Sequence, residues 1–155
     1  MVILPYLKNK VLMQLRDFKT GIAFPGQWGF FSGSLEKGET PDDAAHREMW
    51  EEIGYRTDQM HFLSTLGMPE LDNLITHAYF CELTTPLDNI SLHEGYDFGL
   101  FTRQEIRAGQ LFSGRMGKHV PVIPSKYIHI VIDALMLRLH SGGGGVFQDR
   151  GSATF

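Results

Sequence analysis

Three glutamates, Glu48, Glu51 and Glu52, stand close together in the sequence. In an α-helix, positions three and four residues apart lie on the same face. A helix through this segment would therefore gather the three carboxylates on one side. Carboxylate oxygens are hard ligands that suit Mg²⁺, and a carboxylate-bound metal can promote attack of water on a phosphate group.

A surface helix with an acidic, solvated face is the alternative interpretation of this charge run. Like charges at these spacings repel by about a few tenths of a kcal/mol per pair, and no lysine stands among the three glutamates. A divalent cation would offset that repulsion. The opposite side would carry Met49, Trp50 and Ile53, so the helix has an apolar side for a core.

The residues around the glutamates mark where this helix begins and ends. Thr40 is a favoured N-cap residue, Pro41 suits the first helical position, and the two acids that follow suit the positive end of the helix dipole. Gly54 occupies the position that commonly ends a helix in the left-handed conformation. The pattern predicts a helix from about Pro41 to Ile53.

The segment from Gly33 to Tyr55 reads GSLEKGETPDDAAHREMWEEIGY. It resembles the Nudix box, GX5EX7REUXEEXGU with U a bulky apolar residue, at every specified position. Weaker similarity to small bacterial MutT-type members covers most of Val2 to Ile106. The resemblance implies an α/β/α sandwich with a mixed β-sheet between helices. It also implies hydrolysis of a pyrophosphate linkage by water attack at phosphorus, with Mg²⁺ as cofactor or Mn²⁺ in its place.

The same resemblance assigns roles to residues of the box. Glu51 and Glu52 are expected to be the main metal ligands. Glu48 is a further ligand and a candidate general base, and Arg47 would hold its carboxylate through a charge-assisted hydrogen bond. The carbonyl of Ser32, just ahead of the box, is the expected backbone ligand.

Some family members take the base from a later loop instead. Glu94 is the candidate for that role here, with Asp97 as a weaker substitute, and a solvent-facing turn acid is an equally good interpretation of Glu94. Two glycines, Gly33 and Gly38, are expected to adopt positive φ in the loop before the helix. Glu39 is expected to support that loop and the metal site.

The residues ahead of the box depart from the common family pattern. Proline and glycine usually precede the first box glycine, whereas this chain has Phe31 and Ser32. A backbone carbonyl does not depend on its side chain, so the predicted ligand can survive the change. The geometry of the loop, and with it the fit of the substrate, is where a difference is expected.

A nucleotide substrate needs an apolar or aromatic surface for its base and cations for its phosphates. Arg16 and Lys118 are candidates for phosphate binding, and His77 or His119 could assist, although single basic residues and histidines are more often structural or exposed. Aromatic residues of this kind are more often core residues than platforms for a base. The aromatic candidates are Phe24, Trp28, Phe30 and Tyr79.

Three functions compete on these grounds. The first is hydrolysis of a (deoxy)nucleoside triphosphate, which the intact box on a small domain favours. The second is hydrolysis of ADP-ribose or a nucleotide sugar. The third is a nucleotide-sensing module without turnover, which the three intact glutamates disfavour. A homodimer is a further arrangement that the family resemblance allows.

Hydrophobic patterns place the other elements around the predicted helix. A second amphipathic helix is expected at Ser125–His140, with Ile128, Ile132, Leu135, Met136 and Leu139 on its apolar side, and a helical turn at Gln104–Ala108. The predicted strands are Val2–Leu7, Val11–Leu15, Trp28–Phe31, His61–Met68, Leu74–Leu83 and Phe98–Thr102.

Length and composition fit one folded domain over residues 1–140, followed by a Gly-rich, flexible tail over 141–155. A net charge of -4 argues against binding a nucleic acid polymer through a broad basic surface. The single cysteine, Cys81, excludes an internal disulfide framework. No signal peptide or membrane-spanning run is apparent, so a cytoplasmic enzyme that binds a small nucleotide is expected.

Overall fold

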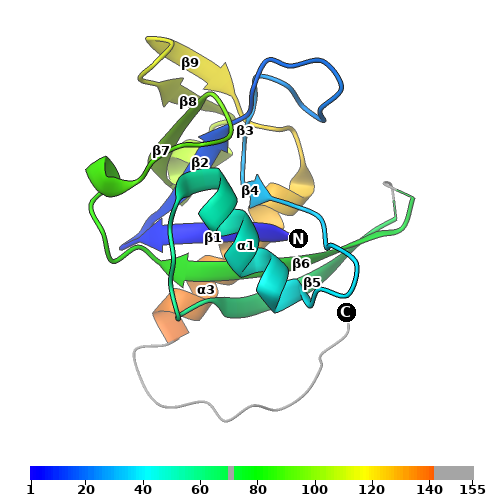
Figure 1. Ribbon diagram of the computed structural model, residues 1–155. Coiled ribbons are helices and arrows are strands. Elements are labelled where there is room, and N and C mark those ends of the chain that lie inside the picture. Colours follow the sequence, from blue (N-terminus) through cyan, green and yellow to red (C-terminus); the bar gives the residue numbers. More distant parts are fainter. Residues whose placement is uncertain (70–71, 142–155) are drawn as a thin grey trace.

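The computed structural model describes residues 1–69 and 72–141, and a seven-stranded mixed sheet forms its centre (Figure 1). Helices lie on both sides of this sheet. A two-stranded hairpin, which forms a sheet of its own, lies at one end. The strands are β1 (Val2–Leu7), β2 (Lys10–Leu15), β3 (Trp28–Gly29), β4 (Phe31–Ser32), β5 (His61–Met68), β6 (Leu74–Glu82), β7 (Asp97–Thr102), β8 (Gln110–Ser113) and β9 (Lys118–Pro121). The helices are α1 (Pro41–Ile53), α2 (Arg103–Arg107) and α3 (Lys126–Ser141), with a short 3-10 helix η1 (Leu87–Asn89).

The sheet combines parallel and antiparallel pairing. Its main path runs β3-β2-β1-β6-β5, while β4 pairs with β1 and β7 pairs with β2. Strands β1 and β6 are parallel, with Val2 opposite Ala78 and Tyr6 opposite Glu82. The remaining pairs in the sheet are antiparallel. The predicted mixed sheet is thereby confirmed.

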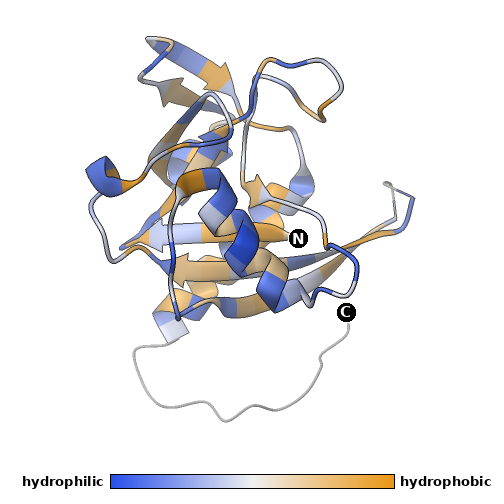
Figure 2. Ribbon diagram, viewed as in Figure 1, coloured by the Kyte–Doolittle hydropathy of each residue, from blue (hydrophilic) through white to orange (hydrophobic). Residues whose placement is uncertain are grey.

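Two apolar cores lie on opposite faces of the sheet, because successive strand residues point to opposite sides. Ile3 and Tyr79 pack with Met49 and Ile53 of α1. Their strand neighbours pack with α3 on the other face. Figure 2 shows the apolar strands beneath α1, whose outward side is hydrophilic. The predicted α/β/α sandwich is confirmed.

Most predicted elements are found with small shifts at their ends. The bounds of α1, β1 and β5 agree with the sequence prediction. The second helix runs over Lys126–Ser141, one residue later than predicted, and α2 forms where a helical turn was expected. The single strand predicted at Trp28–Phe31 was wrong: β3 and β4 are separate, because they pair with different neighbours, β2 and β1.

The hairpin of β8 and β9 was not predicted. Its strands have four residues each, and β8 alternates exposed and buried side chains over that short length. Within the described part of the chain, no helix has the length and apolar character needed to cross a membrane. The flexible tail predicted at 141–155 lies outside the described residues except for Ser141, which ends α3.

Candidate functional site

The helix that carries the three glutamates is fixed at both ends by the predicted capping residues. The Thr40 side chain accepts a hydrogen bond from the backbone N–H of Asp43 at 3.2 Å. Gly54 is left-handed, with φ 64°, and its N–H donates to the carbonyl of Trp50 at 2.9 Å. These caps fix which residues face the sheet and which face the loop before the helix.

Arg47 is the centre of an ionic network on α1. Its guanidinium donates to both carboxylate oxygens of Glu39, at 2.8 and 3.0 Å, and to the carbonyl of Ser34 at 2.9 Å. One further nitrogen, Nη1, donates to Glu48 at 2.9 Å and to Glu51 at 3.0 Å. The hydrogen bond from Arg47 lowers the pKa of the Glu39 carboxyl. Arg47 therefore offsets the electrostatic repulsion among the glutamates of α1, which have no lysine among them.

Glu48 lies directly against Gly33, the first glycine of the box. A Cβ atom at position 33 would stand 1.9 Å from the Glu48 carboxyl carbon and 1.9 Å from its Oε1. Positive φ was expected at both loop glycines, and the expectation holds for Gly38, whose φ is 83°, but was wrong for Gly33. Gly33 is needed for space and not for its backbone angle. Burial raises the pKa of Glu48, against the effect of Arg47.

Glu52 is buried on the same helix, with 4% of its surface exposed. Its Oε2 accepts a hydrogen bond from Nε2 of Gln14 at 2.8 Å, and its Oε1 receives a longer one, 3.4 Å, from the N–H of Ser32. In residues 1–69 and 72–141 no cationic side chain forms an ion pair with it. Burial raises the pKa of Glu52 to about 8, and the nearby charge of Glu94 also raises it.

The three glutamates share one side of α1 without forming a ready-made metal cage. Across the described residues, no three acidic, histidine or cysteine side chains converge closely enough to hold a metal ion. Arg47 draws Glu48 and Glu51 toward itself, while Glu52 turns to the sheet. The prediction that Trp50 belongs to the core side was wrong, because it is 45% exposed and stacks with Arg56 at 4.0 Å.

The loop that contains Glu94 packs against the C-terminal end of α1. The backbone N–H groups of His93 and Glu94 donate to the carbonyl of Glu52, at 2.8 and 3.4 Å. The side chain of Glu94 is exposed, and its charge raises the pKa of both Glu48 and Glu52. The structure therefore brings this late residue to the glutamates of the box.

Asp97, the weaker substitute, serves the fold instead. It is 7% exposed, and its Oδ2 accepts hydrogen bonds from the Ser113 hydroxyl at 2.6 Å and from the N–H of Arg115 at 3.2 Å. These bonds tie the β8–β9 hairpin to the sheet. With the Phe98 N–H on Oδ1, both oxygens of Asp97 have partners within the fold, which favours a structural role for this residue.

A cavity of about 660 Å³ opens next to the glutamates. Ser32 and Gly33 form part of its wall, and these two residues also contact Glu52 and Glu48. Arg16 lines the cavity as well, with its Nε bonded to the carbonyl of Ala23 at 2.7 Å. Most of the remaining wall is apolar. Its apolar side chains include Phe24, Phe30, Leu66, Met68, Leu74, Ile75, Ile123, Ile128 and Val131.

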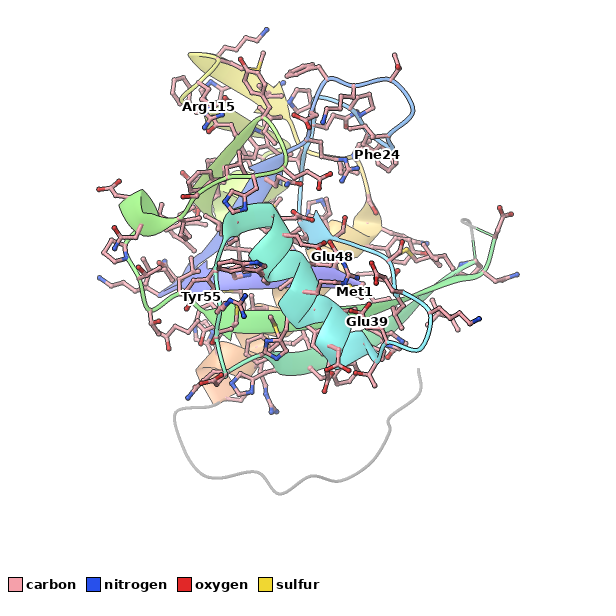
Figure 3. All side chains as sticks on the ribbon, in the orientation of Figure 1. Met1, Phe24, Glu39, Glu48, Tyr55 and Arg115 are labelled. Atoms are coloured by element: carbon pink, nitrogen blue, oxygen red, sulfur yellow. The ribbon has the colours of Figure 1, made fainter. Side chains whose placement is uncertain are left out.

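The structure separates the four aromatic candidates into two pairs. Phe24 and Phe30 line the cavity, and Phe24 is 44% exposed at the loop that follows β2 (Figure 3). Trp28 is fully buried, and its indole N–H donates to the carbonyl of Leu111 at 3.1 Å. Tyr79 is 4% exposed and packs in the core under α1. Trp28 and Tyr79 are core residues, so their assignment to substrate binding is corrected.

The other polar candidates do not reach the cavity wall. His77 lies on β6, bonded to the hydroxyl of Thr65 at 3.0 Å, while Lys118 and His119 lie on the distant β9. In Figure 3, Glu48, Met1 and Glu39 follow one another along the same side of α1.

Gln14 is the residue at this site that sequence reasoning missed. It is 3% exposed, although it stands in a strand whose other central residues are apolar. A polar side chain inside such an apolar run was the available signal, since buried amides need hydrogen-bond partners.

Phe31, which replaces the usual proline ahead of the box, is fully buried in the core beneath α1. It pairs with Ile3 across β4 and β1. The aromatic ring thus anchors the strand that presents Ser32 to the cavity. The Ser32 N–H is the group seen facing Glu52, and the role of its carbonyl stays a prediction.

Comparison with known proteins gives a family match for most of the chain. The model of the NUDIX domain matches residues 1–119. An 8-oxo-dGTP diphosphatase of Proteus vulgaris is 38% identical over 72 residues, which are 46% of this chain and 62% of the relative. The chain therefore matches less than two thirds of that relative's length.

Solved structures share the same arrangement of sheet and helices at low sequence identity. The NUDIX domain of Shewanella oneidensis NrtR, in complex with ADP ribose, has a TM-score of 0.66 and 15% identity, covering 89% of this chain and 85% of that one. An Ap4A hydrolase of C. elegans has a TM-score of 0.64 and 17% identity, covering 90% and 96%. Both similarities concern the fold.

Proposed function

Because the chain belongs to the NUDIX domain family, we propose that it hydrolyses the pyrophosphate linkage of a nucleoside triphosphate or deoxynucleoside triphosphate. The observation that carries this proposal is the shared wall between the cavity and the carboxylates. Ser32 and Gly33 line the cavity on one side and contact Glu52 and Glu48 on the other. A nucleoside held in the cavity would place its phosphates at the glutamates.

The chemistry of the donor groups fits Mg²⁺ or Mn²⁺, which prefer carboxylate and carbonyl oxygens. Glu52 supports this directly, because a buried carboxylate without an ion pair is costly and a cation would compensate its charge. Glu48, Glu51 and Glu52 would hold the metal, together with the carbonyl of Ser32. When bound, the metal polarises phosphate oxygens and lowers the pKa of a coordinated water.

The residues of the chain itself supply positioning and proton transfer. Arg16 is held by the Ala23 carbonyl through Nε, which leaves the terminal guanidinium nitrogens for phosphate oxygens. Arg47 fixes Glu48 and Glu51 on α1. Glu48 is the proton acceptor that we assign, because burial raises its pKa toward the pH at which a general base is efficient. Glu94 is the alternative base on the adjoining loop.

The wall of the cavity favours a nucleoside over a nucleotide sugar. Phe24, which is 44% exposed, and the aliphatic side chains beside it offer surface for the flat face of a base, whereas Phe30 lines the cavity with only 7% of its surface exposed. Arg16 is the single charged side chain among the residues that line this cavity in the described chain. The other polar side chains of the wall are the hydroxyls of Ser32, Ser34, Thr76, Ser125 and Tyr127, and the apolar side chains outnumber them. The similarity to the Proteus 8-oxo-dGTP diphosphatase supports the same substrate class.

A substrate panel tests the proposal. The purified protein is incubated with Mg²⁺ and each of the nucleoside triphosphates, 8-oxo-dGTP, ADP-ribose and a nucleotide sugar, and the products are separated by ion-exchange chromatography. The expected result is a nucleoside monophosphate and pyrophosphate from a triphosphate. Cleavage of ADP-ribose or the sugar nucleotide alone would assign the second function. Absence of any hydrolysis by the wild type, with normal folding, would support a sensing module.

A matched pair of variants tests the choice of base. Glu48→Gln and Glu94→Gln each remove one carboxylate while keeping the shape of the side chain. We expect Glu48→Gln to lower kcat by about 100-fold or more, which is the usual scale for a general base. Glu94→Gln is expected to have the smaller effect. The reverse order would move the base to the 93–95 loop.

A further inference from the structure

The side chain of Gln14 on β2 connects the sheet to α1 and to the 93–95 loop. Its Nε2 lies 2.8 Å from Oε2 of Glu52 and 2.8 Å from the backbone carbonyl of Glu94. A primary amide has two N–H bonds, so one nitrogen can donate to both acceptors at once. Gln14 thereby spans two segments of the site that are far apart in the sequence.

These contacts close a ring of hydrogen bonds. Gln14 donates to the Glu52 carboxylate and to the Glu94 carbonyl, and the N–H of Glu94 donates back to the Glu52 carbonyl at 3.4 Å. The N–H of His93 reinforces the last link at 2.8 Å. Residue 52 is therefore held at both its side chain and its backbone. The position of its carboxylate and the position of the 93–95 loop are set together.

The surroundings of Gln14 leave it little freedom. Its side chain is almost fully buried, with 3% exposed. Gly95 faces it from the loop, and a Cβ at that position would lie 2.8 Å from Nε2 and 2.8 Å from Cγ of Gln14. The backbone of Gly95 has φ 94°, which disfavours other residues. The loop thus approaches the amide more closely than any side chain at position 95 would allow.

We infer that Gln14 is a positioning residue, which orients the Glu52 carboxylate for a divalent cation and couples it to the loop that carries Glu94. This inference rests on the proposed function. A carboxylate that ligates a metal is commonly held by such an outer hydrogen bond, and loss of the outer partner costs about 10- to 100-fold in metal affinity or activity. Within residues 1–69 and 72–141, the one other hydrogen bond to the Glu52 carboxylate is the 3.4 Å contact from the Ser32 N–H.

The first test replaces Gln14 by methionine, which keeps the length and burial of the side chain and removes both donors. Mn²⁺ binding is measured by calorimetry on the protein without substrate, with Gln110→Met on the exposed surface of β8 as the control. We expect the Mn²⁺ dissociation constant to rise about 10-fold or more in Gln14→Met and to stay unchanged in Gln110→Met. Equal affinity in folded Gln14→Met and wild type would overturn the inference.

Kinetics distinguish positioning from general loss of structure. In Gln14→Met we expect kcat to fall and the Mg²⁺ concentration for half-maximal rate to rise, while KM for the nucleotide at saturating Mg²⁺ stays the same. A change in nucleotide KM alone, with kcat and the Mg²⁺ requirement unaltered, would contradict the proposed role.

A measurement on the wild type keeps the test independent of folding of the variant. In ¹H–¹⁵N spectra, the side-chain amide signal of Gln14 should shift as Mg²⁺ is added, in parallel with the backbone signals of Glu52 and Glu94. The Gln110 side-chain amide serves as the internal control. A Gln14 signal that stays unmoved while Glu52 responds would overturn the coupling. If the wild type binds metal and hydrolyses nothing, the proposed function fails while these comparisons still decide the role of Gln14.

Discussion

Gly33 and Glu48 occupy the same small space, so that the carboxyl group of Glu48 lies where a side chain at position 33 would be. A Cβ on residue 33 would come within 1.9 Å of the Glu48 carboxyl carbon. Since φ of Gly33 is not positive, a substitution there disturbs the packing against Glu48 and does not strain the backbone.

Gly33→Ala is therefore expected to displace Glu48 and to lower kcat by about 100-fold, the scale of a 1 Å misplacement in a catalytic site. Gly38→Ala is the matched control in the same loop. Its φ is 83° and nothing lies within 4 Å of an added Cβ, so it strains only the backbone, at about 1 kcal/mol of stability. Steady-state kinetics and thermal unfolding of both variants check the prediction. Equal loss of activity in both would contradict it.

Arg47→Lys tests the ionic network on α1. Lysine keeps the charge but loses the planar fork that holds Glu39, Glu48 and the Ser34 carbonyl together. We expect a stability loss on the order of 1 kcal/mol, because the network is partly exposed, and a larger loss in kcat. Urea unfolding and kcat are measured in parallel. An activity equal to wild type would show that Glu48 is held by other contacts.

The stability of the metal-free protein should depend on the charge of Glu52. Its folded-state pKa of about 8 lies above the ordinary 4.5, so the folded protein binds this proton more tightly than the unfolded chain does. The stabilising contribution is complete below about pH 4.5 and is lost as pH rises through about 8. We expect the free energy of unfolding to fall by a few kcal/mol over that window, an order-of-magnitude figure.

Glu52→Gln removes this titration, so its stability should be flatter between pH 4.5 and 8. Urea unfolding in the presence of a chelator, at several pH values, measures the difference. Added Mg²⁺ at pH 8 should stabilise the wild type by mass action and the variant much less. Parallel pH profiles for the two proteins would show that Glu52 does not titrate in this range.

Substitution of Phe24 should weaken nucleotide binding, whereas substitution of Trp28 should lower the stability of the fold. Phe24 is exposed at the cavity and has φ 52°, an unfavourable angle for a bulky residue. Phe24→Gly should raise the nucleotide KM about 2- to 10-fold, the value of an aromatic contact, without loss of stability. Trp28→Ala should lose about 3 to 5 kcal/mol of stability from the core. Unchanged KM in Phe24→Gly would place the base elsewhere.

Features that depend on neighbouring residues could be predicted from the sequence alone. The caps Thr40 and Gly54 set the bounds of α1, and the spacing of the glutamates set their common side. Capping and helical periodicity are local, so four to seven residues contain the information. The bounds of β5, His61–Met68, were likewise predicted from a short hydrophobic run of the chain.

Which of these side chains contact one another depends on how the strands and helices pack. Gln14 contacts Glu52, 38 positions away, and the Glu94 carbonyl, 80 positions away. Those contacts require β2, α1 and the 93–95 loop to come together, which no local pattern specifies.

The same limit explains the corrected assignments. Phe24 and Trp28 are both aromatic residues of one segment, yet one lines the cavity and the other is fully buried. The close approach of the Glu48 carboxyl group to Gly33 likewise cannot be predicted from the sequence, because it depends on how α1 packs. Residue type gives the chemistry that a side chain can perform, whereas its burial and partners depend on how strands and helices pack.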